Sequence, residues 1–161
     1  MTEWTSFKPP TPAFGVTDPA FGDRIEIERG KGRYQHWALS LGGKDVMNFN
    51  STGSGDTVVS IFITKDGKAR IISQELQVVA GSSLFRINNG DDDRHFGSPG
   101  LPGGWPTRQK VLDNTSEFQE LYPKYRLVRN NCECFVNYAR YGERYSTQAR
   151  NILRPFRATN K

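Results

Sequence analysis

The residues best suited to chemistry are a cysteine and a histidine that lie far apart in the chain. Asn131 has the side chain of a helix N-cap, so a helix is expected to begin at Cys132. A thiol in the first turn of a helix gains thiolate character from the helix dipole and the unpaired amides. Such a nucleophile also needs a base. The chain has two histidines, and His36, inside a predicted strand, is the better candidate.

The same residues also permit a purely structural interpretation. His36 lies in an otherwise apolar strand, where a polar side chain is costly without a partner, and a hydrogen bond alone would satisfy it. Cys132 would then be an inert core residue. Cys134 is too close to Cys132 for an ordinary disulfide and is expected to point away from its face, so both are expected to be thiols. His95, in an acidic loop, is weak evidence for a metal site, and no metal is expected.

Alternating hydrophobic residues predict a small sheet in the first two thirds of the chain. Strands are expected over 23–29, 34–41 and 46–49, with Gly42 and Gly43 at a turn. A second hairpin is expected from strands over 58–64 and 69–79, around a turn at 65–68. A last strand over 83–87 precedes a loop over 88–104, and loops of that length are often functional.

After this loop the hydrophobic spacing becomes helical. Three helices are expected, and they begin after Pro106, Asn131 and Ser146. The apolar face of the first consists of Val111, Phe118 and Leu121, and that of the second of Cys132, Phe135, Val136 and Ala139. The apolar face of the third consists of Ala149, Ile152, Leu153 and Phe156. Strands followed by helices predict an α+β fold with a small antiparallel sheet packed against these helices.

Length and composition indicate a single domain. The chain has 161 residues and a net charge of +5, and we expect a proline-rich arm over 1–22, a domain over 23–157 and a tail over 158–161. Apolar stretches such as 58–63 are far shorter than a membrane-spanning helix. The first residues resemble neither a signal peptide nor a transit peptide, so a cytosolic location is expected.

Positive charge is concentrated near the C-terminus. Residues 124–161 hold nine basic and two acidic side chains, a net charge of +7, whereas the preceding 123 residues sum to −2. This asymmetry favours a polyanionic partner, either RNA or an anionic membrane surface. The candidate binding residues are Arg140, Arg144, Arg150, Arg154 and Arg157. The alternative is a solvated helical face whose apolar stripe packs on the sheet.

Several motifs together resemble a known family. In order they are Gly22-Asp-Arg-Ile-Glu-Ile, His36-Trp-Ala-Leu-Ser-Leu-Gly42, Val79-Ala-Gly-Ser, Asn88-Asn89, Asp91-Asp92, Asn131-Cys-Glu-Cys-Phe-Val-Asn137 and Arg140-Tyr-Gly142. This series resembles the lecithin:retinol acyltransferase-like family, a permuted relative of the papain-like NlpC hydrolases. The resemblance implies that Cys132 is the nucleophile, that His36 is the base, and that acyl transfer proceeds through a thioester. No cofactor is expected.

The chain departs from this family at three places. Asn48 stands where the cellular enzymes have a second histidine that orients the base. Asparagine orients a catalytic imidazole in papain-like enzymes, so the resemblance implies that role for Asn48. Cys-Glu-Cys at 132–134 replaces the usual Cys-Glu-His, and an arginine-rich segment stands where most cellular acyltransferases have a hydrophobic anchor.

These departures resemble one branch in particular, the picornavirus 2A proteins of the H-box/NC type found in parechoviruses and kobuviruses. That resemblance implies a viral non-structural protein that binds a host protein or RNA during replication, in the host cytoplasm or at replication membranes. Its Cys/His pair would be degenerate or weakly active. The alternative is an active thiol acyltransferase or phospholipase A that uses Cys132 and His36. Neither interpretation includes polyprotein cleavage, and the oligomeric state stays open.

Overall fold

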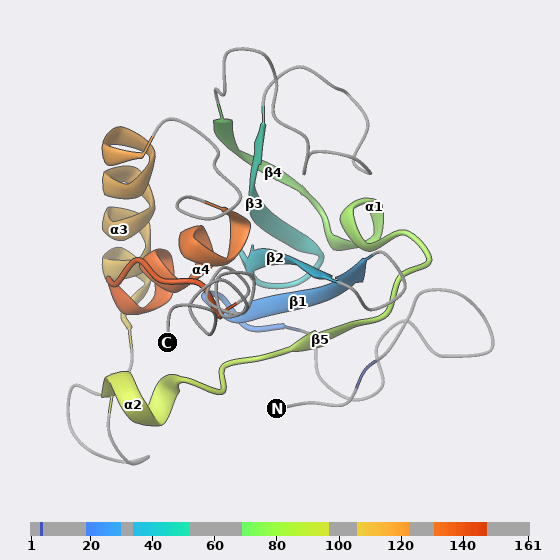
Figure 1. The fold of residues 1–161 in the computed structure, drawn as a ribbon, viewed down its shortest axis with the longest axis horizontal. Coiled ribbons are helices and arrows are strands. Elements are labelled where there is room, and N and C mark those ends of the chain that lie inside the picture. The colour runs from blue at the N-terminus through green and yellow to red at the C-terminus, as the bar shows by residue number, and fades with distance from the viewer. Residues whose placement is uncertain are drawn as a thin grey trace, which may run out of the picture.

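The computed structural model describes residues 4, 19–29, 34–51, 69–96, 106–122 and 131–147. These ranges contain five strands and four helices (Figure 1). The strands are β1 (Arg24–Arg29), β2 (Tyr34–Ser40), β3 (Asp45–Ser51), β4 (Ala69–Glu75) and β5 (Phe85–Ile87). The helices are α1 (Leu76–Ala80), α2 (Asp92–Phe96), α3 (Arg108–Leu121) and α4 (Cys132–Tyr141).

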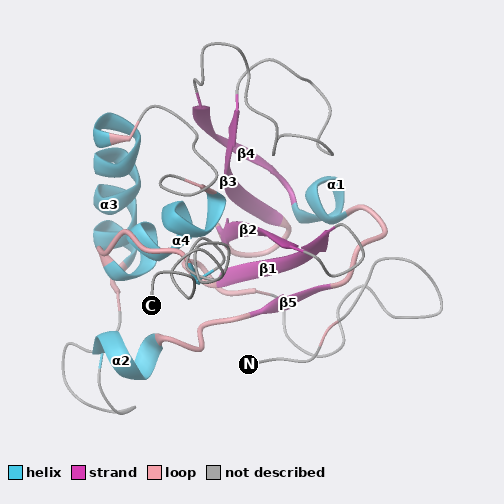
Figure 2. Cartoon of the chain, viewed as in Figure 1, coloured by secondary structure: helices cyan, strands magenta, loops and turns pink. Residues whose placement is uncertain are grey.

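The five strands form one antiparallel sheet in the order β4-β3-β2-β1-β5. The strands predicted over 23–29 and 34–41 are confirmed, and the pairing of β3 with β4 joins the two halves into one sheet. Gly42 and Gly43 make the β2–β3 turn with positive φ angles of 87° and 62°, which glycine adopts readily. The strand predicted over 58–64 lies outside the described residues. The α+β class is confirmed (Figure 2).

Two short helices lie where the sequence predicted a strand and a loop. The strand predicted over 69–79 is wrong beyond Glu75, because α1 begins there. Leu76, Val79 and Ala80 have helical spacing and are all buried, and the Leu76 N–H donates to the Lys44 carbonyl oxygen at 2.7 Å. The second short helix, α2, lies inside the loop predicted over 88–104. No helix within the described ranges is long and apolar enough to cross a membrane.

The sheet separates two hydrophobic clusters, because neighbouring residues of a strand point to opposite faces. The first cluster joins one face of β2 and β3 to the long helices α3 and α4. The second joins the other face, on β1, β2, β3 and β5, to α1. The members of the first are Trp37, Leu39, Met47, Phe49, Val111, Phe118, Cys132, Cys134, Phe135, Val136 and Ala139. Those of the second are Ile25, Ile27, Ala38, Val46, Leu76, Val79, Ala80 and Phe85.

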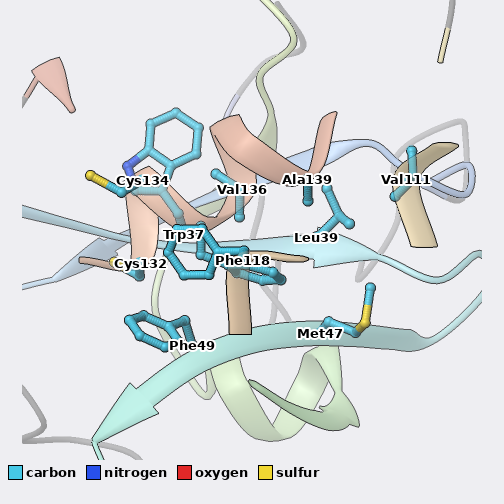
Figure 3. Packing of buried hydrophobic residues seen from close by; sticks show 11 residues of the cluster. Trp37, Leu39, Met47, Phe49, Val111, Phe118, Cys132, Cys134, Val136 and Ala139 are labelled. Carbon is cyan, nitrogen blue, oxygen red and sulfur yellow. The ribbon is translucent and has the colours of Figure 1, made fainter. Parts of the chain in front are cut away.

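In each of the two long helices, α3 and α4, the burial of one residue differs from the prediction. Leu121 was expected to pack inward, but its side chain is 53% exposed, because it lies in the last turn of α3 and Tyr122 packs against the cluster instead. Cys134 was expected to point away, yet it is buried in the same cluster as Cys132 (Figure 3). The first turn of α4 is enclosed on all sides, so direction around the helix does not decide burial there.

Helix α4 also buries a polar stripe that the hydrophobic pattern did not reveal. Glu133, Asn137 and Arg140 are at most 5% exposed. The Arg140 guanidinium donates to both carboxylate oxygens of Asp92 at 2.8 and 2.7 Å, and to the Gly22 carbonyl oxygen at 2.7 Å. This pair joins the C-terminal end of α4 to the start of α2.

Replacing Arg140 with methionine removes the charged partner of the buried Asp92 carboxylate. We expect the free energy of unfolding, measured by urea titration, to fall by about 3–5 kcal/mol, the usual cost of removing one member of a buried ion pair. The control is Arg144→Met, because Arg144 is exposed and lies over the Tyr122 ring at 4.5 Å. This control should lose less than about 1 kcal/mol. Equal losses in the two variants would contradict the assignment.

Candidate active site

Two of the predicted site residues, His36 and Asn48, meet on neighbouring strands. β2 pairs with β3 so that Asn48 lies opposite Ala38, two residues from His36 and on the same face of the sheet. His36 Nε2 lies 3.4 Å from Asn48 Oδ1. The Asn48 side chain is fully buried, and His36 is half-buried. The central strands therefore position the imidazole and the amide as a pair.

The contacts of Asn48 determine which imidazole nitrogen carries the proton. Asn48 Nδ2 donates to the Ile72 carbonyl oxygen at 3.3 Å and to Gln74 Oε1 at 3.1 Å. A backbone carbonyl only accepts hydrogen bonds, so the amide nitrogen faces β4 and Oδ1 faces His36. His36 Nε2 must then donate its N–H to Oδ1. The lone pair of the neutral imidazole consequently lies on Nδ1.

The environment of His36 favours the neutral imidazole. Desolvation and, to a lesser extent, the positive charge of Arg29 lower the pKa of His36 from 6.5 to about 4, against the opposing effect of the hydrogen bond with Asn48. At neutral pH the side chain is an uncharged base. This state is the one that general-base catalysis requires at the start of the reaction.

Arg29 is a site residue that the sequence analysis missed. Its guanidinium donates to the carbonyl oxygens of Val79 and Ala80 at the end of α1, and to Ser83 Oγ at 2.6 Å. Desolvation lowers the pKa of Arg29, and favourable interactions with Tyr34 and Cys132 oppose this shift. An arginine that ends an amphipathic strand gives no sequence signal that separates it from an ordinary surface residue.

Cys132 is the first residue of α4, as predicted. The Asn131 side chain accepts the Cys134 N–H at 3.0 Å, so the predicted N-cap is confirmed. Cys132 is 4% exposed, is a thiol, and belongs to the cluster that contains Trp37 and Phe49. Burial raises the pKa of the neighbouring Cys134 thiol to about 11, so Cys134 is a poor nucleophile at neutral pH.

A buried carboxylate beside Cys132 fastens the first turn of α4. Glu133, which is 2% exposed, accepts hydrogen bonds from Ser146 Oγ at 2.6 Å and from the Thr147 N–H and Oγ1 at 2.9 and 2.6 Å. Asn131 Nδ2 also donates to Ser146 Oγ, at 3.2 Å. The N-cap, the glutamate and the segment after α4 therefore form one network. The Asn-Cys-Glu motif was the available signal, but it did not reveal this role for Glu133.

Two of the three predicted site residues are thus in contact with each other, whereas the third lies on a different element. His36 and Asn48 are in direct contact on the face of the sheet that carries α1. Cys132 belongs to the cluster on the opposite face, at the end of a helix that packs against β2 and β3. The Arg29 charge interacts with both His36 and Cys132 and is therefore the electrostatic link between them.

The arginines expected to bind an anionic partner lie in different environments. Arg140 lies inside the fold and is bound by Asp92, whereas Arg144 is exposed. Arg150, Arg154 and Arg157 lie outside the described residues. The expectation that Arg140 contacts a polyanion therefore conflicts with its burial, because its guanidinium is already occupied by a carboxylate.

His95, the second histidine, has a packing environment that the sequence analysis did not anticipate. Its ring stacks on Tyr141 with 4.2 Å between ring centroids and on Tyr145 with 5.6 Å. Its Nε2 lies 3.3 Å from the Tyr145 hydroxyl. The described residues contain no cluster of three metal-ligating side chains, around His95 or elsewhere.

The sequence is similar to proteins of known class. The pattern of the family described as lecithin retinol acyltransferase matches residues 17–145. Human phospholipase A and acyltransferase 3 is 34% identical over 140 residues, which cover 86% of this chain and 80% of that protein. Human phospholipase A and acyltransferase 1 is 37% identical over 143 residues, which cover 84% and 76%. The family match includes the elements that carry Cys132, His36 and Asn48.

The low pKa of His36 predicts a measurable effect of Arg29. In an NMR titration, the His36 imidazole should take up its proton near pH 4, as its pKa implies. In Arg29→Gln the pKa should rise, because a nearby positive charge is removed; in Arg29→Lys, which keeps the charge, it should stay closer to that of the unmodified protein. A His36 pKa that is the same in all three proteins would contradict the electrostatic link.

The lowered pKa of His36 also predicts the direction in which the free energy of unfolding changes with pH. The unfolded chain protonates His36 near its ordinary pKa of 6.5, whereas the folded chain does so near 4. The unfolded state therefore binds more protons between these values, and the contribution of His36 to stability is lost as the pH falls from about 6.5 to about 4.

Proposed function

The chain belongs to the lecithin retinol acyltransferase family, and from this premise we propose that it is a cysteine-dependent phospholipase A and acyltransferase. The observation that carries the proposal is the His36–Asn48 pair, whose geometry leaves a neutral imidazole with its lone pair on Nδ1. The relatives named as phospholipases and acyltransferases support the reaction class. The proposed substrate is therefore the acyl ester of a phospholipid.

In the first half of the proposed reaction, Cys132 Sγ attacks the ester carbonyl carbon while His36 Nδ1 takes the thiol proton. The carbonyl oxygen becomes an oxyanion, for which we assign the backbone N–H group of Cys132, at the start of α4, as a donor. The intermediate then collapses, His36 returns the proton to the leaving alkoxide, and the lysophospholipid departs. The acyl group remains on Cys132 as a thioester.

The second half of the proposed reaction releases the acyl group. Water or an acceptor amine attacks the thioester carbonyl carbon, and His36 removes a proton from the attacking group. Cys132 leaves as the thiol when the proton returns to sulfur. The product is a free fatty acid with water, or an amide with an amine. The low pKa of His36 favours proton transfer during each attack over a preformed thiolate–imidazolium pair.

A binding function for the basic C-terminal quarter stays a prediction from charge alone. It rests on the net charge of +7 over residues 124–161. Of its candidate residues, Arg144 is exposed and Arg140 is buried against Asp92. The resemblance to picornavirus 2A proteins, and with it a location in the host cytoplasm, likewise stays a prediction from the motifs. The named relatives favour the enzymatic function instead.

The proposed mechanism requires that His36 reach Cys132. We expect 1,3-dibromoacetone, which joins a thiol to a nearby imidazole through a three-carbon bridge, to cross-link these two side chains. Peptide mass spectrometry would identify the product, and His36→Gln should give a singly alkylated Cys132 without a bridge. The other imidazole, His95, is the internal control and should not be bridged. Alkylation of Cys132 without any bridge in the unmodified protein would contradict the mechanism.

Lipid turnover tests the function itself. On phosphatidylcholine vesicles, Cys132→Ser should abolish fatty acid release, and His36→Gln should lower the rate by about 10²- to 10⁴-fold, the usual contribution of a general base. Cys134→Ala is the matched control, because its buried thiol with a raised pKa has no role in the mechanism. Release of fatty acid that is unchanged in Cys132→Ser would refute the proposal.

A further inference from the structure

We infer that Gln74 is a positioning residue that selects the tautomer of His36 by fixing the orientation of the Asn48 amide. Gln74 lies on β4, outside the motifs that identify the family in this chain. In the sheet register Asn48 lies opposite Ile72 and Val46 lies opposite Gln74, so Gln74 is the diagonal neighbour of Asn48 on the same face. The role of the selected nitrogen as a base rests on the proposed function, but the selection itself does not.

The amide group of Asn48 is buried. Asn48 is 0% exposed, so both N–H bonds of its side chain need protein acceptors. The Ile72 carbonyl oxygen accepts one at 3.3 Å, and Gln74 Oε1 accepts the other at 3.1 Å. The shorter of the two bonds is the one to Gln74. Both acceptors come from β4, so this strand holds the amide nitrogen away from His36.

The alternative amide orientation has a specific consequence. Turning the Asn48 amide by half a turn would direct Oδ1 at the Ile72 carbonyl oxygen, and two oxygen atoms cannot hydrogen-bond without a proton. The Gln74 amide would also have to turn, so that its nitrogen rather than Oε1 faced Asn48. The amide nitrogen would then donate to His36 Nε2. That nitrogen would have to accept, and the imidazole proton would move to Nδ1. A base at Nδ1 is therefore available only in the orientation that the β4 acceptors impose.

Of the two acceptors that bind the Asn48 amide, Gln74 is the one that a substitution can remove. The Ile72 acceptor is backbone and stays in place with any side chain at that position. The Gln74 amide contributes a second acceptor that a substitution can remove. Without it, one Asn48 N–H loses its partner, and the preference for the observed orientation is expected to fall by about three- to tenfold, the effect of one net hydrogen bond.

Three substitutions separate this role from a general effect on folding. Gln74→Met keeps the length of the side chain and removes the acceptor. Gln74→Glu keeps an acceptor at the same place and adds a negative charge. Gln77→Met makes the same chemical change at an exposed glutamine of α1 and is the matched control. Thermal unfolding of each variant shows whether it is folded at the temperature of the experiment.

The tautomer is read directly from long-range ¹H–¹⁵N NMR correlations at neutral pH. The chain has two histidines, so the spectrum contains two imidazoles, and a His95→Gln variant assigns them. We expect His36 to be the Nε2–H tautomer in the unmodified protein, in Gln74→Glu and in Gln77→Met. In Gln74→Met the fraction of Nδ1–H should increase by about three- to tenfold. An unchanged tautomer in a folded Gln74→Met protein would overturn the inference.

The rate of Cys132 alkylation against pH supplies a second readout. Gln74→Met should lower the rate at neutral pH, because fewer molecules carry a lone pair on Nδ1. Gln74→Glu should restore the rate, and its acidic limb should move to higher pH, because a nearby negative charge raises the pKa of an imidazole. Equal rates and identical pH profiles in the two variants would overturn the inference when the tautomer is also unchanged, and would refute the role of His36 as the base of Cys132 when the tautomer shifts.

The two readouts distinguish this inference from the proposed function. A tautomer shift in Gln74→Met without any lipid turnover by the unmodified protein would leave the role of Gln74 intact and refute the enzymatic proposal. Lipid turnover with a tautomer that does not respond to Gln74 would support the enzyme and refute the positioning role.

Discussion

The buried polar stripe of α4 is the constraint on which much of the structure depends. A helix that buries Glu133, Asn137 and Arg140 must find a partner for each, because an unsatisfied buried amide costs about 1–3 kcal/mol and an unpaired buried charge costs more. The partners come from distant parts of the chain: Arg24 on β1 donates to Asn137, Asp92 on α2 pairs with Arg140, and Ser146 with Thr147 binds Glu133. The sheet, α2 and the segment after α4 are therefore tied to the helix that carries the cysteine.

The candidate site combines a hydrogen bond that orients the imidazole with surroundings that keep it neutral. Asn48 contacts the His36 ring at Nε2, and desolvation and, to a lesser extent, the Arg29 charge disfavour the imidazolium. Arg29 is itself fastened to the end of α1 by three backbone or hydroxyl oxygens. Helix α1, which carries none of the predicted site residues, thus supports the site by holding the arginine in place.

The sequence predicted those parts of the protein that a local pattern encodes. Alternation of side chains was sufficient for β1 and β2, and the Asn131 cap with its apolar spacing was sufficient for the start of α4. The break between β4 and α1 was missed, because the run from Ala69 to Val79 is apolar enough for either element, and the contact with Lys44 is long-range. Residue types and motifs indicated Cys132, His36 and Asn48, and the structure shows a contact between the last two. The polar partners were not predicted, because the sequence does not show whether an arginine or a glutamine is buried or exposed.

The attachment of α4 at both of its ends has a mechanical consequence. Glu133 holds the first turn to the segment that follows the helix, and Arg140 holds the last turn to Asp92. A shift of the helix along its axis by one residue, about 1.5 Å, would break charged hydrogen bonds at both ends together. The two attachments therefore set the depth of the Cys132 sulfur relative to the sheet, and a substrate of the proposed reaction would have to adjust its own position to reach it.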